Sequence, residues 1–216
     1  MQQELKTKNI VLAGFFDPSA FDKLFFVKNE ILNEDQILAG SIFDGNSVQL
    51  IGISFHILVL SNQVIITDLK PNENTPIDKT ILSIISAGKI SKVIALGINF
   101  HWFLEDKSKS LEQFSKDLFY NDKIKILADF FKSANSAFGV YASTDFMNAR
   151  MKLDVKPNTI TEINQTGNVL NKQVLNFAFN FHFEIKNPSD NSEMLQYISE
   201  YNSYKQETEK IMSIYI

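Results

Sequence analysis

The sequence predicts an α+β protein in which antiparallel β-meanders are covered on one face by helices. Two observations predict this fold class. Short segments with alternating apolar and polar residues, separated by turn residues, are typical of antiparallel strands. Pairs such as Asp17-Pro18 and Thr75-Pro76 place an N-cap and a proline before segments whose apolar residues recur at helical spacing. The 44% hydrophobic and 21% charged composition is that of an ordinary globular chain.

In residues 1–104 we expect a first half with the order β-α-β-β-β-α-β. The turn residues Asp44-Gly45-Asn46 separate two apolar segments, and Gly88 ends the second helix. The expected strands span residues 8–16, 36–43, 48–60, 63–69 and 90–103, and the expected helices span residues 17–28 and 75–88.

Residues 105–137 predict a helical connection, with amphipathic helices at 108–119 and 122–133. Residues 138–216 predict a second half, a meander followed by a long C-terminal helix that ends near residue 213. Its strands are expected at residues 138–147, 149–156, 159–164 and 172–185. Because both halves contain a meander, a polar loop and a helix, the chain is either a degenerate internal duplication or one single domain without a repeat.

Composition and charge exclude several classes of function. The chain has no cysteine, which removes disulfides and thiolate chemistry and is typical of the cytoplasm. It lacks a signal sequence and a long apolar run, so we expect no membrane association. Twenty of the 21 basic residues are lysine, dispersed among 25 acidic residues, which argues against nucleic-acid binding. No nucleotide-binding glycine loop or known catalytic motif is present, so we expect no cofactor, and the sequence favours a protein that is not an enzyme.

Each of the three histidines follows a phenylalanine in an expected strand. The strand alternation places Asn180, His182 and Glu184 on one face, opposite a row of phenylalanines. The candidate polar cluster comprises His56, Asn99, His101, Asn180, His182 and Glu184. If their strands were neighbours, these residue types would suit a metal or general acid–base site. The interpretation we favour is half-buried histidines on the solvent side of a sheet, so we assign no metal ligand.

Aromatic residues provide the other candidates. The chain has 19 phenylalanines, which either fill the core or line a cavity for an apolar ligand. Tyr197, Tyr201 and Tyr204 lie on the expected C-terminal helix and are the candidate interface residues. The alternative for these tyrosines is that they pack onto the protein's own sheet.

The sequence therefore favours a non-catalytic protein-binding or assembly module, which forms a homo-oligomer or joins a larger intracellular complex. Its partner would be another protein or a second copy, bound through the tyrosines or through an exposed edge strand of the first meander. Two alternatives stay open. The first is a carrier of an apolar small molecule in a phenylalanine-lined cavity, and the second is a metal-dependent enzyme that uses the three histidines.

Overall fold

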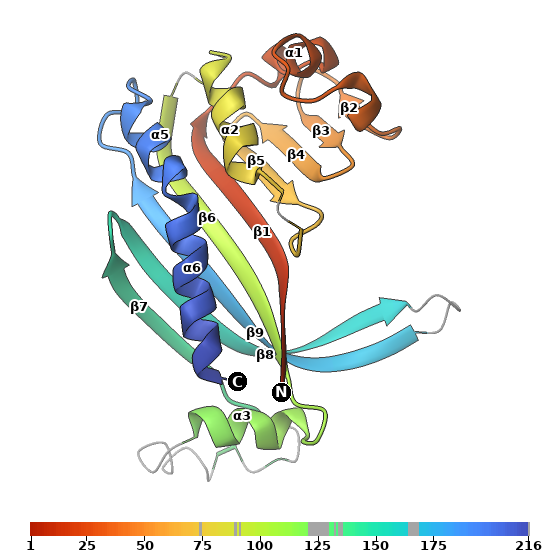
Figure 1. Ribbon diagram of the computed structural model, residues 1–216, viewed down its shortest axis with the longest axis vertical. Coiled ribbons are helices and arrows are strands. Elements are labelled where there is room, and N and C mark those ends of the chain that lie inside the picture. The colour runs from red at the N-terminus through yellow and green to blue at the C-terminus, as the bar shows by residue number, and fades with distance from the viewer. Residues whose placement is uncertain are drawn as a thin grey trace.

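One antiparallel sheet of nine strands runs through the protein (Figure 1). The structure is a computed structural model. It describes residues 1–73, 75–88, 90, 92–120, 130–131, 133, 136–163 and 169–215, without the side chains of residues 162, 163 and 170. The sheet and the helices beside it confirm the α+β class.

The strands are β1 (Gln2–Phe15), β2 (Ile42–Phe43), β3 (Val48–Ile51), β4 (Phe55–Leu60), β5 (Gln63–Asp68), β6 (Lys92–Glu105), β7 (Val140–Phe146), β8 (Ala149–Ile163) and β9 (Val169–Glu184). Their order in the sheet is β2-β3-β4-β5-β1-β6-β9-β8-β7. The four strands of 14 to 16 residues, β1, β6, β8 and β9, form most of the length of the sheet. The short strands β2 to β5 form one side of the sheet, and β7 is the edge strand on the other side.

The sheet has a repeated order of elements on the two sides of the β1–β6 pair, which we call the seam. Outward from the seam, the strands run β1-β5-β4-β3 in one direction and β6-β9-β8-β7 in the other. Each side has the chain order strand, helix, meander, helix, although the first meander has the additional two-residue strand β2 and the second side ends with two helices, α5 and α6. The internal duplication considered from the sequence stays a hypothesis, and we use the terms first and second repeat only as names for the β1 side and the β6 side of the sheet. The order of elements makes β6, expected as the last strand of the first half, the first strand of the second repeat.

The helices cover one face of this sheet, the inner face, which carries Phe100 and Phe181. They are α1 (Lys23–Lys28), α2 (Ile77–Ser86), α3 (Leu111–Phe119), α5 (Ser192–Ser199) and α6 (Tyr201–Met212). Figure 1 shows α2, α5 and α6 on the same side of the sheet. Every second residue of β6 and β9 points toward the helices, and these residues join one continuous core. Phe100 and Phe181 are fully buried there, with ring centroids 6.1 Å apart.

Several elements differ from their expected bounds. The expected helix at 17–28 is a 3-10 turn, Pro18–Ala20, followed by α1. Asp22 caps the start of α1, because its carboxylate accepts a 2.7 Å hydrogen bond from the Phe25 amide. The expected strand at 36–43 contains only β2. The C-terminal helix is interrupted at Glu200, although its buried stripe continues from α5 into α6. The expected helix at 122–133 lies mostly outside the described residues.

Candidate functional site

A polar row crosses the face of the sheet that the helices leave uncovered, which we call the outer face. Asn9, Asn99 and Asn180 lie directly opposite one another on β1, β6 and β9. Asn180 donates a 2.6 Å hydrogen bond to Asn99, which donates a 2.7 Å bond to Asn9. Thr67 and Lys152 continue the row at its two ends. Asn99 and Asn180 are members of the cluster expected from the sequence, whereas Asn9 is not, although the alternation of residues along β1 places it on the same face.

The three histidines lie on this outer face but are not brought together. His56 is on β4, separated from β6 by β5 and β1. His101 lies opposite Ala178 and His182 opposite Gly97, so they are four positions apart along the paired strands, about 13 Å. No group of three or more histidine, aspartate or glutamate residues in the described part of the chain could hold a metal ion. The arrangement therefore offers no clustered ligand set for the metal-dependent alternative.

Two members of the candidate cluster differ in their environment. Glu184, at the end of β9, is exposed and lies opposite Ala95. His101 is partly buried, and burial lowers the pKa of its imidazole, an effect that the neighbouring Asn176 side chain opposes. A lowered pKa keeps the ring neutral at neutral pH.

The candidate interface tyrosines lie in the core of their own chain. Tyr201 and Tyr204 are 3% and 0% exposed, and Tyr197 is 8% exposed. Their rings pack on the inner-face phenylalanines: Tyr197 stacks on Phe183, with centroids 4.7 Å apart. Burial raises the pKa of the Tyr201 and Tyr204 hydroxyls above the usual range of tyrosine. Packing onto the sheet explains these residues, so the expectation that they form an intermolecular surface is corrected.

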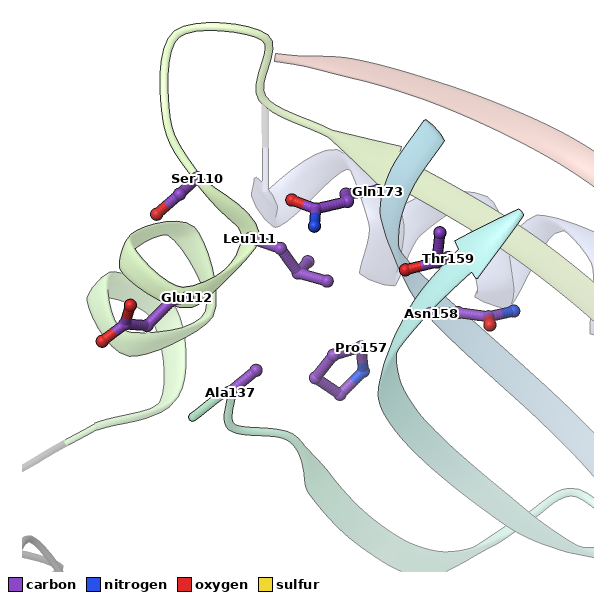
Figure 2. Close-up of a pocket in the computed structure, with 8 residues that line it drawn as sticks. All are labelled: Ser110, Leu111, Glu112, Ala137, Pro157, Asn158, Thr159 and Gln173. Carbon is purple, nitrogen blue, oxygen red and sulfur yellow. The ribbon is translucent and has the colours of Figure 1, made fainter. Parts of the chain in front are cut away.

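The alternative function, a carrier of an apolar small molecule, requires a cavity lined by phenylalanine. A cavity of about 380 Å³ lies between α3 and the strands β8 and β9, and its lining includes Leu111, Glu112, Pro157 and Gln173 (Figure 2). A second, of about 550 Å³, lies beside α6. Among the described residues, no phenylalanine lines either of these two cavities, and the smaller cavities of about 210–240 Å³ have at most two phenylalanines in their linings. The inner-face phenylalanines are instead covered by the helices.

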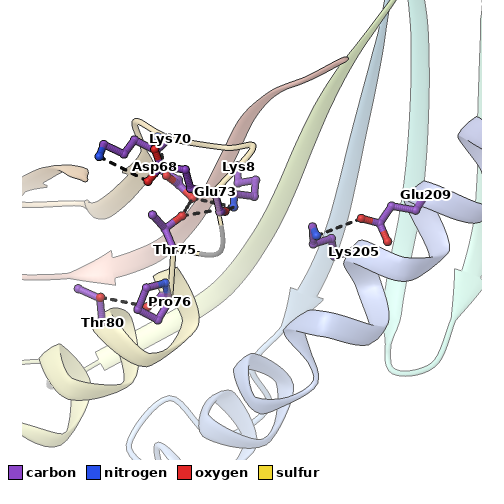
Figure 3. A network of polar contacts seen from close by, with 9 residues as sticks. All are labelled: Lys8, Asp68, Lys70, Glu73, Thr75, Pro76, Thr80, Lys205 and Glu209. Carbon is purple, nitrogen blue, oxygen red and sulfur yellow. Dashed lines mark hydrogen bonds and ion pairs between the residues drawn. The ribbon is translucent and has the colours of Figure 1, made fainter. Parts of the chain in front are cut away.

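A buried ion pair joins β1 to the end of β5. Lys8 and Asp68 have side chains 3% and 0% exposed, and the lysine nitrogen lies 2.8 Å from the carboxylate. Lys8 also donates hydrogen bonds to the Glu73 carbonyl, 3.2 Å, and to the Thr75 hydroxyl, 3.3 Å (Figure 3). Asp68 accepts from the Lys70 amide at 2.7 Å. With this many partners inside the chain, the pair fixes the loop between β5 and α2 to the sheet.

The two edges of the sheet are unlike. At the first edge, residues 37–43 cover β3: Ile42 and Phe43 of β2 pair with it, and the Leu38 amide donates to Ile51. At the second edge, β7 pairs only with β8 among the described strands. Val140 and Tyr141 are 39% and 63% exposed. The exposed edge strand was expected in the first meander, but there the edge strand has two residues.

These features define an α+β protein with a nine-stranded sheet, an inner face covered by helices, and an edge strand, β7, that pairs on one side only among the described strands. Comparison with protein-family models, with curated proteins and with solved structures finds no match. Among the described residues, no helix has both the length and the apolar character needed to cross a membrane.

Proposed function

We propose that the protein is a non-catalytic assembly module that associates with a second copy of itself through the outer edge of β7. The observation that carries this proposal is the contrast between equivalent edges. In the first repeat, a segment of the same chain pairs with β3, whereas among the described residues no strand pairs with the outer side of β7. A partner strand would satisfy the outward N–H and C=O groups of β7 in the same way.

The composition of β7 supports strand pairing. Its sequence, VYASTDF, is rich in β-formers and contains no lysine, proline or glycine, the residues that commonly protect an edge strand. Its only charged residue, Asp145, accepts a hydrogen bond from Arg150 at 2.9 Å. Asp145 is therefore the one charge on β7 that an approaching strand would meet.

Two copies of β7 are suited to antiparallel pairing about a two-fold axis. Pairing of all seven residues places Ser143 of one copy opposite Ser143 of the other, and Val140 opposite Phe146. The joined sheets would be continuous across the two protomers. Because a seven-residue edge buries less than about 1,200 Å² in total, we expect weak association, in the micromolar range.

Charge substitution at Ser143 tests this arrangement. Two lysines opposite each other at the axis repel, and Lys152 of β8 lies beside each of them, so Ser143→Lys should be monomeric in sedimentation velocity up to high micromolar concentration. Ser143→Glu should weaken association less, because Lys152 lies beside each glutamate. An equimolar mixture of the two variants should restore a dimer, because opposite charges then meet. Gln49→Lys and Gln49→Glu on β3 are the matched controls, since this exposed position lies on the covered edge and should not affect association.

A wild-type protein that remains monomeric at high micromolar concentration would contradict the proposal. So would single Ser143 variants that dimerise as well as the wild type, or association that the Gln49 variants abolish equally. Stronger association in the mixture than in either variant alone would support both the edge and its two-fold register.

A further inference from the structure

The polar row on the outer face leads to the two-fold axis proposed for the β7 dimer. Asn99, Asn180, Lys152 and Ser143 lie directly opposite one another on β6, β9, β8 and β7. Ser143 is also the residue that antiparallel pairing of β7 places opposite its own copy. The row of one protomer would therefore continue into the row of the other, with the order Lys152, Ser143, Ser143, Lys152 across the axis.

Lys152 has no anionic partner among the described residues of its own chain. Its ammonium group forms neither an ion pair nor a hydrogen bond with them, although the residue is partly buried. Asp154, two residues along β8, pairs with Lys156. Asp145, on the neighbouring strand, pairs with Arg150 at 2.9 Å. Both carboxylates on this part of the outer face are thus neutralised by other cations, and Lys152 keeps a surplus positive charge.

Pairing of the two edges brings the two copies of Lys152 close to the axis. The strand order across the interface is β8-β7-β7-β8, so the two β8 strands are three strand spacings apart, about 14 Å. Opposite residues on paired strands have neighbouring Cβ atoms, which lets each Lys152 extend over Ser143 of its own protomer. One strand spacing, about 5 Å, then separates the two ammonium groups. Two cations at this separation repel each other, and one oxyanion between them accepts hydrogen bonds from both.

We propose that the axis of the β7 dimer binds one tetrahedral oxyanion of the phosphate class between the two Lys152 ammonium groups. The two Ser143 hydroxyls are further donors to the same anion. This inference rests on the dimer proposed above, because one protomer supplies only half of the site. Since the anion binds the dimer and not the monomer, it strengthens association by mass action.

Sedimentation velocity of the full chain in chloride and in phosphate tests the site. The pH and the total ionic strength are kept equal, so that general screening of charge is the same in both buffers. We expect about 10 mM inorganic phosphate to lower the dissociation constant of the dimer about fivefold relative to chloride. Phenyl phosphate under the same conditions has no effect if the site takes only a free phosphate ion, and acts equally if it takes the phosphoryl group of a larger molecule.

The variant Lys152→Gln should remove the response to phosphate and leave the dimer intact. Because the substitution also removes the repulsion between the two lysines, association in chloride should be at least as strong as that of the wild type. Lys79→Gln is the matched control, since it removes the same charge from an exposed position of α2, which packs on β1 and β5. This variant should keep the full response to phosphate.

The outcomes separate the oxyanion site from the β7 edge itself. A dimer that forms equally well in chloride and in phosphate overturns the oxyanion site and leaves the edge pairing in place. A response to phosphate that Lys152→Gln retains, or that Lys79→Gln loses to the same extent, also overturns the site. A protein that is monomeric under every condition overturns both proposals. Loss of the response in Lys152→Gln alone, with dimerisation retained, supports the site.

Discussion

Asn9 and Asn99 face each other across the seam, and the Asn99 carboxamide donates a 2.7 Å hydrogen bond to the Asn9 side chain. Asn99 also accepts the bond from Asn180, so it is the middle member of a chain of three carboxamides. All three side chains are partly buried. The two repeats are therefore joined at their centre by side-chain bonds as well as by the backbone ladder.

Replacement of Asn99 by alanine removes both of these hydrogen bonds. We expect Asn99→Ala to lower the free energy of unfolding by about 1–2 kcal/mol, because each net hydrogen bond contributes about 1 kcal/mol and water reaches the groups left behind. Asn180→Ala removes one bond and should lose about half as much. Urea denaturation measures both losses. Equal losses of stability for the two variants would contradict the assignment of two side-chain hydrogen bonds to Asn99.

The buried pair of Lys8 and Asp68 should be far more important for stability than an exposed pair. Lys8→Met leaves the Asp68 carboxylate buried without its cation, which should lower the free energy of unfolding by about 3–5 kcal/mol. The control is Lys109→Met, which breaks a 2.6 Å pair with Asp117 at the surface and should cost no more than about 1 kcal/mol. Similar losses in urea denaturation would mean that solvent reaches the Lys8 pair.

Removal of the hydroxyl of Tyr201 and removal of the hydroxyl of Tyr204 should have different effects on stability. The Tyr201 hydroxyl is buried without a hydrogen-bond partner among the described residues, so Tyr201→Phe should leave stability unchanged or raise it by up to about 1 kcal/mol. The Tyr204 hydroxyl donates a 2.8 Å bond to Glu200, so Tyr204→Phe should lower stability by about 1 kcal/mol. Thermal denaturation compares the two. A clear loss in Tyr201→Phe would reveal a partner for that hydroxyl.

His101 should make the folded state sensitive to mild acid. Burial lowers the pKa of His101 in the folded protein, so the unfolded chain binds a proton more readily. Stability should therefore fall as the pH drops below about 6.5, the pKa of an unperturbed histidine. His101→Gln should lose less stability than the wild type between pH 7 and pH 5.5, and His182→Gln on the same face serves as the control. Parallel pH profiles for His101→Gln and the wild type would contradict this assignment.

The alternation of residues along a strand was sufficient to predict the faces of β9. Phe179, Phe181 and Phe183 are at most 1% exposed, whereas Asn180 and His182 between them are partly exposed. The period of two follows from strand geometry alone and needs no knowledge of neighbouring strands. For the same reason, the sequence could predict an Asn-His row on an outer face.

Strand order could not be predicted in the same way. Pairing of β1 with β6 joins residues far apart in the chain, and no local pattern records such a partner. The histidines could thus be placed on a face but not at a distance from one another. The tyrosines of α5 and α6 show a further limit, because a ring that packs on the protein's own sheet and one that binds a partner have the same helical spacing.

The seam has a consequence for synthesis on the ribosome. Asn9 and Asn99 are 90 positions apart, so β1 emerges long before the strand that pairs with its second edge. At ordinary rates of translation, that edge waits for about 5–20 seconds. Meanwhile β1 can pair with β5, and α2, which is made before β6, can already pack on β1. The part of the nascent chain that a chaperone would have to protect at this stage is thus the second edge of β1, whose N–H and C=O groups wait for β6.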